Sequence, residues 1–157
     1  MARVKVLLKV RDVMVTNVVT VDVGVNIRKA VQRMNNQEIS CLVVLEKGNF
    51  AGILTERDVL KRVVAEARNP EKTLVGDVMS KPLIVVNPEA SLEEALELMF
   101  EKRVKKLTVV KDKELVGLIT MTDIARMHTT LVEHIKRLAA KYDIPKRMKK
   151  VIQYYVV

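Results

Sequence analysis

Threonine and aspartate stand three residues apart at two places in the chain, Thr55 with Asp58 and Thr120 with Asp123. We expect each threonine to begin a helix, where unpaired backbone N–H groups and the helix dipole attract phosphate oxygens. The aspartate follows one turn later, and its carboxylate accepts two hydrogen bonds, as a ribose diol requires. The same spacing is also an N-capping arrangement, in which Thr caps the helix and Asp complements its dipole. Both interpretations stay open on the residues alone.

The two segments belong to a tandem repeat. At an offset of 65 residues, positions 12–60 match positions 77–125 without a gap and share eleven identities. The identities include an Asp-Val-Met triplet at the start of each copy and a Gly-x-x-Thr-x-x-Asp motif near its end. A register held over this length indicates a duplicated structural unit.

Each copy predicts the same order of elements: a strand, a helix, two strands and a second helix. A β-branched run predicts the first strand, an apolar stripe at helical spacing predicts the helix, and two apolar runs around a polar turn predict a hairpin. Ser91 and Glu94 are spaced as a capping box at the start of one helix. The expected strands are 18–21, 42–45, 51–54, 83–86, 107–110 and 116–119, with helices opening near residues 27, 55, 92 and 120.

This order, with the motif at Gly52 to Asp58 and again at Gly117 to Asp123, resembles the CBS domain family. The segment from Met79 to Val86, running into Ser91-Leu92-Glu93-Glu94-Ala95, is also similar to that family. The resemblance covers residues 10–126 and implies an α/β (α+β) fold, with tandem β-α-β-β-α repeats packed as a pseudo-two-fold pair, or Bateman module. The implied domains are residues 10–65 and 75–126, followed by a basic, helical C-terminal tail over 127–157.

The resemblance further implies two clefts between the copies that bind adenosine ligands such as AMP, ADP, ATP or S-adenosylmethionine. In the first predicted site Thr55 and Asp58 hold ribose and phosphate, Leu83 and Ile84 flank adenine, and Lys105 and Lys106 contact the phosphates. In the second, Thr120 and Asp123 act with Val18 and Val19, and Arg57 reaches the phosphates. Ser40 and Cys41 are the counterparts of the two lysines in the second site. We therefore expect the first site to prefer ligands with more phosphates.

The chain of 157 residues has a formal net charge of +9, and most of the excess lies in the tail. Residues 126–157 contain eight Lys or Arg and two acidic residues. Such a run is typical of a solvated face, or of a surface for phosphate-rich partners. The apolar spacing from Ile124 to Leu138 predicts an amphipathic helix, Pro145 ends it, and residues 151–157 are β-prone. Alternating apolar residues over 4–10 predict an N-terminal strand with one exposed face.

Composition excludes several classes of protein. With 49% apolar residues the chain can bury a core, no apolar run is long enough for a membrane span, and one cysteine forms no internal disulfide. His128 and His134 do not share a helix face, so we predict no metal site. No nucleophile–base pair and no P-loop occur, so we predict neither an enzyme nor a catalytic cofactor. We expect a cytoplasmic protein.

The sequence therefore predicts a non-catalytic module that senses an adenine nucleotide through a ligand-dependent conformation and acts on an unidentified protein target. The family resemblance also implies a homodimer of side-by-side modules. The alternative, from a different class, is a nucleic-acid-binding regulator that uses the basic tail.

Overall fold

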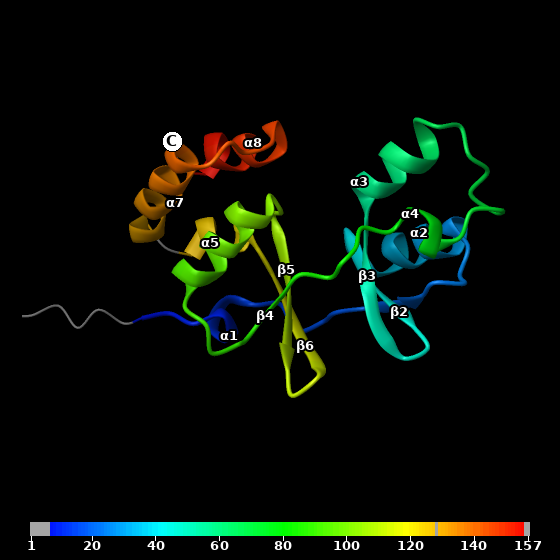
Figure 1. The fold of residues 1–157 in the computed structure, drawn as a ribbon, viewed down its shortest axis with the longest axis horizontal. Helices are drawn as coiled ribbons and strands as arrows, with labels where there is room; N and C mark the ends of the chain where they lie inside the picture. The colour runs from blue at the N-terminus through cyan, green and yellow to red at the C-terminus, as the bar shows by residue number, and fades with distance from the viewer. Residues whose placement is uncertain (1–6, 128, 156–157) are drawn as a thin grey trace, which may run out of the picture. The chain divides into compact units, whose positions relative to one another are not determined.

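The duplicated sequence folds into two three-stranded sheets (Figure 1). The computed structural model describes residues 7–127 and 129–155. The chain divides into two compact units. Residues 18–84 form the first unit, and residues up to 17 together with those from 85 onward form the second.

The first unit carries the first sheet, in the strand order β1-β2-β3. Its elements are β1 (Thr20–Asp22), α2 (Ile27–Gln37), β2 (Cys41–Glu46), β3 (Asn49–Thr55), α3 (Glu56–Val59), a π-helical turn η1 (Leu60–Val64) and α4 (Val75–Val78). β1 is parallel to β2, and β3 returns antiparallel to β2. The side chains of Ile27, Ala30 and Met34 are buried in the core, as the helical spacing predicts.

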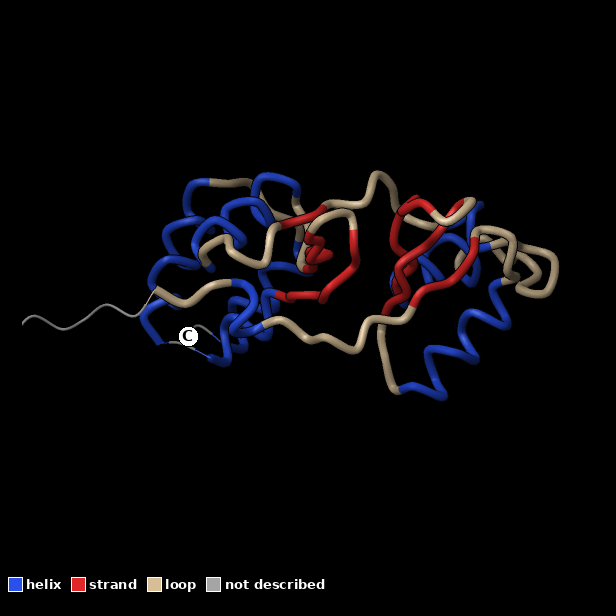
Figure 2. Tube along the Cα trace, turned by 90° about the horizontal axis from the view of Figure 1, so that it is seen from below, coloured by secondary structure: helices blue, strands red, loops and turns tan. Residues whose placement is uncertain are grey.

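The second unit repeats this topology and adds helices at both ends. Its elements are α1 (Val10–Val13), β4 (Val85–Val86), α5 (Leu92–Lys102), β5 (Lys106–Lys111), β6 (Glu114–Thr120), α6 (Met121–Met127), α7 (Thr129–Lys141) and α8 (Lys146–Tyr155). β4 is parallel to β5, and β5 pairs antiparallel with β6. Helices and strands form separate layers within each unit (Figure 2). None of the helices in the described part of the chain is long and apolar enough to cross a bilayer.

The predicted order of elements is confirmed in both copies. Ser91 caps α5 and forms the predicted capping box with Glu94. The first strand of each copy begins two residues later than predicted, at Thr20 and at Val85. The parallel ladder in the first sheet runs from Thr20, although the carbonyl of Val19 still accepts the N–H of Val43 at 3.0 Å.

The two ends of the chain differ from their sequence-based predictions. Residues 4–6 of the N-terminal strand predicted over 4–10 lie outside the described residues, and Val10 begins a helix. The β-prone prediction is wrong for residues 151–155, which continue α8. Fully buried Met148 anchors that helix, so packing outweighs the β propensity of the following residues. The predicted tail helix is present as α6 and α7, and His128 between them lies outside the described residues.

The outer edge of each sheet is closed by a segment from outside the repeat copy that forms the sheet. Ile53 of β3 exchanges two backbone hydrogen bonds with Ser80, at 2.9 and 2.8 Å. Leu118 of β6 exchanges two with Val15, at 2.8 and 2.9 Å. Glycine permits this approach, because a Cβ at Gly52 would fall against the Ser80 carbonyl oxygen and one at Gly117 would lie 2.6 Å from the Met14 sulfur. The glycine that opens each copy of the motif is therefore required for close packing at the edge of its sheet.

Substitution of Gly52 by alanine tests this requirement. We expect Gly52→Ala to lower the free energy of unfolding by about 1–3 kcal/mol, because the added methyl group meets backbone that cannot move without breaking the Ile53–Ser80 pair. Urea denaturation followed by circular dichroism measures the change. Gly24→Ala is the matched control, since its Cβ would meet only a flexible Asp22 side chain at 3.2 Å. Equal stability of the two variants would contradict the packing argument.

Candidate functional site

The first Thr-x-x-Asp motif lies where β3 ends and α3 begins. The hydroxyl of Thr55 accepts the backbone N–H of Asp58 at 3.2 Å. Oδ2 of Asp58 accepts the backbone N–H and the hydroxyl of Thr55, at 2.8 and 2.9 Å. These reciprocal bonds form a capping box, so the capping interpretation of the spacing is confirmed here. Cap formation leaves Oδ1 of Asp58 for other partners.

Oδ1 of Asp58 contacts two side chains, Ser80 in the segment that follows α4 and Arg62 in η1. The hydroxyl of Ser80 donates to it at 2.7 Å, and Nη1 of Arg62 lies 3.3 Å away. Arg62 also donates to the backbone carbonyls of Val78 and Met79. Asp58 is only 7% exposed. Because a carboxylate has about four acceptor positions and four donors already surround this one, a new partner must displace Ser80 or Arg62.

The second motif has the same cap in a less crowded setting. Oδ2 of Asp123 accepts the hydroxyl of Thr120 at 2.7 Å and its backbone N–H at 3.3 Å. The Thr120 hydroxyl accepts the N–H of Asp123 at 3.1 Å. Within the part of the chain that the structure describes, no group donates to Oδ1 of Asp123. This oxygen is therefore accessible to a ligand without prior rearrangement of a described contact.

The repeat explains why the two carboxylates differ. At the offset of 65 residues, Ser80 corresponds to Val15 and Arg62 corresponds to Met127. Val15 makes the same backbone pair with β6 that Ser80 makes with β3, but its side chain has no donor. Met127 is 57% exposed. Oδ1 of Asp58 therefore has side-chain partners in Ser80 and Arg62, whereas the corresponding positions near Asp123 hold Val15 and Met127, which offer no such donor.

The remaining predicted site residues are distributed over both units. Leu83 and Ile84 follow Ser80 in the first unit, which also contains Val18, Val19 and Arg57. Lys105 and Lys106 belong to the second unit, where the Lys105 carbonyl accepts the N–H of Met121 at 2.8 Å and Lys106 pairs with Thr120. The backbone of both lysines is therefore next to the second motif. Their predicted action at Asp58, and that of Val18, Val19 and Arg57 at Asp123, combine different units and stay predictions.

Ser80 and Arg62 are the site residues that the sequence analysis did not identify. Ser80 carries a weak signal, because it is a polar residue at a position where the other copy has valine. Arg62 lies beyond the region in which the copies match and carries no such signal. In the described residues no group of three or more His, Cys, Asp or Glu side chains is arranged to hold a metal ion.

Comparison with known proteins agrees with this architecture. The family model of the CBS domain matches the chain twice, over residues 10–65 and 75–128. The chain is 36% identical to the CBS domain-containing protein YhcV of Bacillus subtilis over 116 residues, which are 74% of this chain and 82% of that protein. The crystal structure of a conserved CBS domain protein of unknown function from Thermoplasma acidophilum matches with a TM-score of 0.73 and 27% identity, covering 87% of this chain and 79% of that one.

An uncharacterised protein of Methanopyrus kandleri is also 36% identical over 105 residues, which are 66% of this chain. The matched region spans 54% of that relative's length. The chain described here belongs to the CBS domain family, as a pair of CBS domains. Such pairs are typically regulatory modules that bind ligands, generally adenosine compounds.

The unequal surroundings of the two aspartates predict unequal effects on stability. We expect Asp58→Ala to lower the free energy of unfolding by about 1–2 kcal/mol more than Asp123→Ala, because it leaves the Ser80 hydroxyl and Arg62 without their acceptor. Both variants lose the same capping interactions, so Asp123→Ala is the matched control. Urea denaturation of each variant provides the comparison. Equal losses would show that the Ser80 and Arg62 contacts contribute nothing to folding.

Proposed function

We propose that this CBS domain pair is a non-catalytic regulatory module that binds an adenosine ligand, with Asp123 as its ribose-binding carboxylate. The single observation that carries the proposal is the Oδ1 atom of Asp123, which accepts no hydrogen bond from the described residues. The capping bonds to Thr120 fix the carboxylate, so its orientation needs no further ordering when a diol binds. The proposed class of ligand comes from the family, because CBS domains generally bind adenosine compounds.

Asp58 has a different part in the proposal. A ligand diol at Asp58 replaces the Ser80 hydroxyl on Oδ1, because that hydroxyl occupies the acceptor position. Ser80 lies on the segment that closes the edge of β3, so its release changes the surface that this segment presents. A ligand that binds only the released form shifts the population toward it. The first motif is thereby suited to convert binding into a conformational signal for a protein target.

The ligand is proposed to be AMP, ADP, ATP or S-adenosylmethionine, with Leu83, Ile84, Val18 and Val19 beside adenine as the resemblance implies. Lys105, Lys106 and Arg57 are proposed as the phosphate contacts. Homodimer formation and a cytoplasmic location stay predictions. No observation in the described residues favours nucleic-acid binding through the tail, whose Ile144 and Met148 are buried within the second unit, and we do not propose it.

Isothermal titration calorimetry with the four ligands tests the role of Asp123. We expect Asp123→Asn to weaken binding about 10- to 100-fold, the equivalent of losing charged hydrogen bonds worth about 1.5–3 kcal/mol. Glu114→Gln is the matched control, since it removes an exposed carboxylate at the far end of β6. Mass spectrometry of ligand retained after mild purification identifies the natural compound. Absence of binding by every adenine nucleotide at millimolar concentration would refute the proposal.

A paired lysine substitution tests the phosphate contacts. We expect Lys105→Ala with Lys106→Ala to weaken ATP and ADP binding more than AMP binding, because each lost ammonium group removes attraction to additional phosphate charge. Calorimetry with the three nucleotides gives the ratio of affinities. Lys111→Ala with Lys113→Ala, on the exposed β5–β6 turn, is the control for a general loss of positive charge. Unchanged ATP and ADP affinities would remove both lysines from the site.

A further inference from the structure

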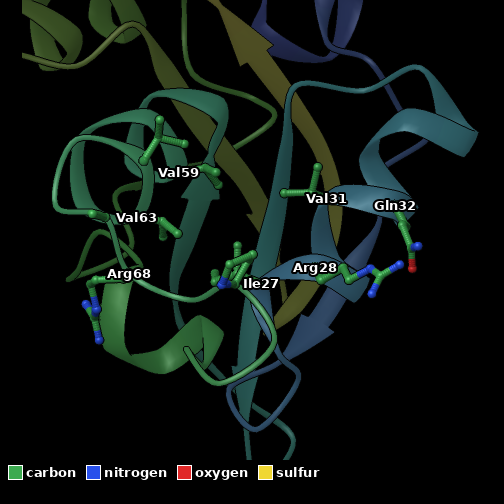
Figure 3. Close-up of a pocket in the computed structure, with 10 residues that line it drawn as sticks. Ile27, Arg28, Val31, Gln32, Val59, Val63 and Arg68 are labelled. Carbon is green, nitrogen blue, oxygen red and sulfur yellow. The ribbon is translucent and has the colours of Figure 1, made fainter.

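The helix that carries Asp58 also carries Arg62, one turn further along the chain. Nη1 of Arg62 lies 3.3 Å from Oδ1 of Asp58. The adjacent face of this helix carries Val59 and Val63, which line the same pocket as Val31 of α2 (Figure 3). Val63 is buried in the core of the first unit. Packing of the two valines therefore fixes the helix and, with it, the positions of Asp58 and Arg62.

Arg62 connects Asp58 to the end of α4. Its Nη1 donates to the backbone carbonyls of Val78, the last residue of α4, and of Met79, the residue that follows. Carbonyls at the C-terminal end of a helix have no partner within the helix, and arginine side chains commonly donate to them. One side chain thus satisfies the end of α4 and the carboxylate of Asp58 together.

Ser80 adds a second connection between the same two elements. Its hydroxyl donates to Oδ1 of Asp58 at 2.7 Å and accepts from Nη1 of Arg62 at 3.4 Å. Its backbone is held separately by the pair of hydrogen bonds with Ile53 of β3. The contacts of Arg62 and Ser80 with Asp58 are called the latch below. All of its residues belong to the first unit.

The second repeat copy has neither side chain of the latch. Val15 and Met127 stand at the corresponding positions, and neither side chain has a donor for Asp123. The backbone arrangement is nevertheless similar, since Val15 pairs with β6 as Ser80 pairs with β3, and α1 contacts α6. The two copies therefore differ at this place in side-chain chemistry and not in their topology.

We propose that the latch competes with ligand for Asp58, so that the chain binds its adenosine ligand in two unequal steps, at Asp123 first and at Asp58 second. A ligand diol requires Oδ1, and at Asp58 this atom is available only in molecules whose Ser80 and Arg62 have moved away. The apparent affinity of that site is reduced by the fraction of such molecules. The inference rests on the proposed function and adds to it the order of binding and the part of Arg62.

Exchange of the latch residues between the copies tests the proposal on the full chain. Arg62→Met with Ser80→Val gives the first copy the residues of the second. Calorimetric titration with AMP measures both steps. We expect the second step of the wild type to be at least about tenfold weaker than the first, and the double variant to strengthen it about tenfold, because the competitor is removed. Lys61→Met is the matched control, since it removes an exposed cation from the same helix.

The reverse exchange adds a latch to the second copy. Val15→Ser with Met127→Arg places a hydroxyl and a guanidinium at the positions that correspond to the latch residues. We expect this variant to weaken the first step about tenfold and to leave the second step unchanged. Asp58→Asn and Asp123→Asn assign the two steps, because each weakens only the step at its own motif.

Hydrogen exchange in the absence of ligand tests the latch separately from nucleotide binding. The amides of Ile53 and Ser80 report the opening of the segment that closes β3, because each donates to the carbonyl of the other residue. We expect Arg62→Met with Ser80→Val to speed their exchange about tenfold in NMR spectra, and Lys61→Met to leave it unchanged. Circular dichroism of each variant confirms that the fold is retained.

The results separate this inference from the proposed function. Two steps of equal affinity in the wild type, a second step that the double variant leaves unchanged, or unchanged exchange of both amides would overturn the inference alone. A weaker second step in the double variant would also overturn it, because Arg62 is then a ligand contact and not a competitor. A wild type with one detectable step, to which the double variant adds a second, supports it. Absence of AMP binding by the wild type and every variant would refute the proposed function as well.

Discussion

The structure depends on the pairing of each sheet edge with a segment from outside its own repeat copy. β3 and β6 are the outer strands of their sheets, and an unpaired edge leaves a row of backbone donors and acceptors without partners. Ser80 satisfies part of this edge in the first unit, and Val15 does so in the second. The second unit therefore includes the opening residues of the first repeat copy, and the first unit continues past its own copy into the opening residues of the second.

The same pairing connects the sheet edge to the candidate site. The segment that closes β3 also brings the Ser80 hydroxyl to Asp58, whereas the segment that closes β6 presents Val15 in the equivalent position. An identical backbone arrangement thus produces two carboxylates of different availability. Duplication preserved Gly, Thr and Asp, which the edge and the helix cap require, while the residues around the second carboxylate oxygen diverged. That divergence gives the two halves of a repeated fold different chemical properties.

Much of the fold followed from the sequence because the repeat doubles each local signal. β-Branched and apolar runs, helical stripes and a capping box at Ser91 all predict elements that the structure contains. The exchange of edge segments was not predictable in this way, since both copies offer the same pattern and local periodicity does not say which copy a segment joins. The helical state of residues 151–155 was also missed, because burial of Met148 in the second unit outweighs local β propensity. At the site, the two caps were predictable from spacing, whereas the Ser80 and Arg62 contacts with Asp58 depend on chain packing.

The basic tail has a structural explanation once its position is known. Six of the nine excess positive charges lie on α7 and α8, which pack on the second pair of repeat helices, and α5 in that pair is acidic. Ile135 of α7 and Met148 of α8 are buried there, and the opposite net charges of α5 and the tail helices avoid repulsion between like charges. The net charge of the tail is therefore better described as the complement of α5 than as a surface for nucleic acid. In the first unit the basic helix α2 carries no acidic residue of its own, and its Arg28 pairs with Glu71 from the loop before α4.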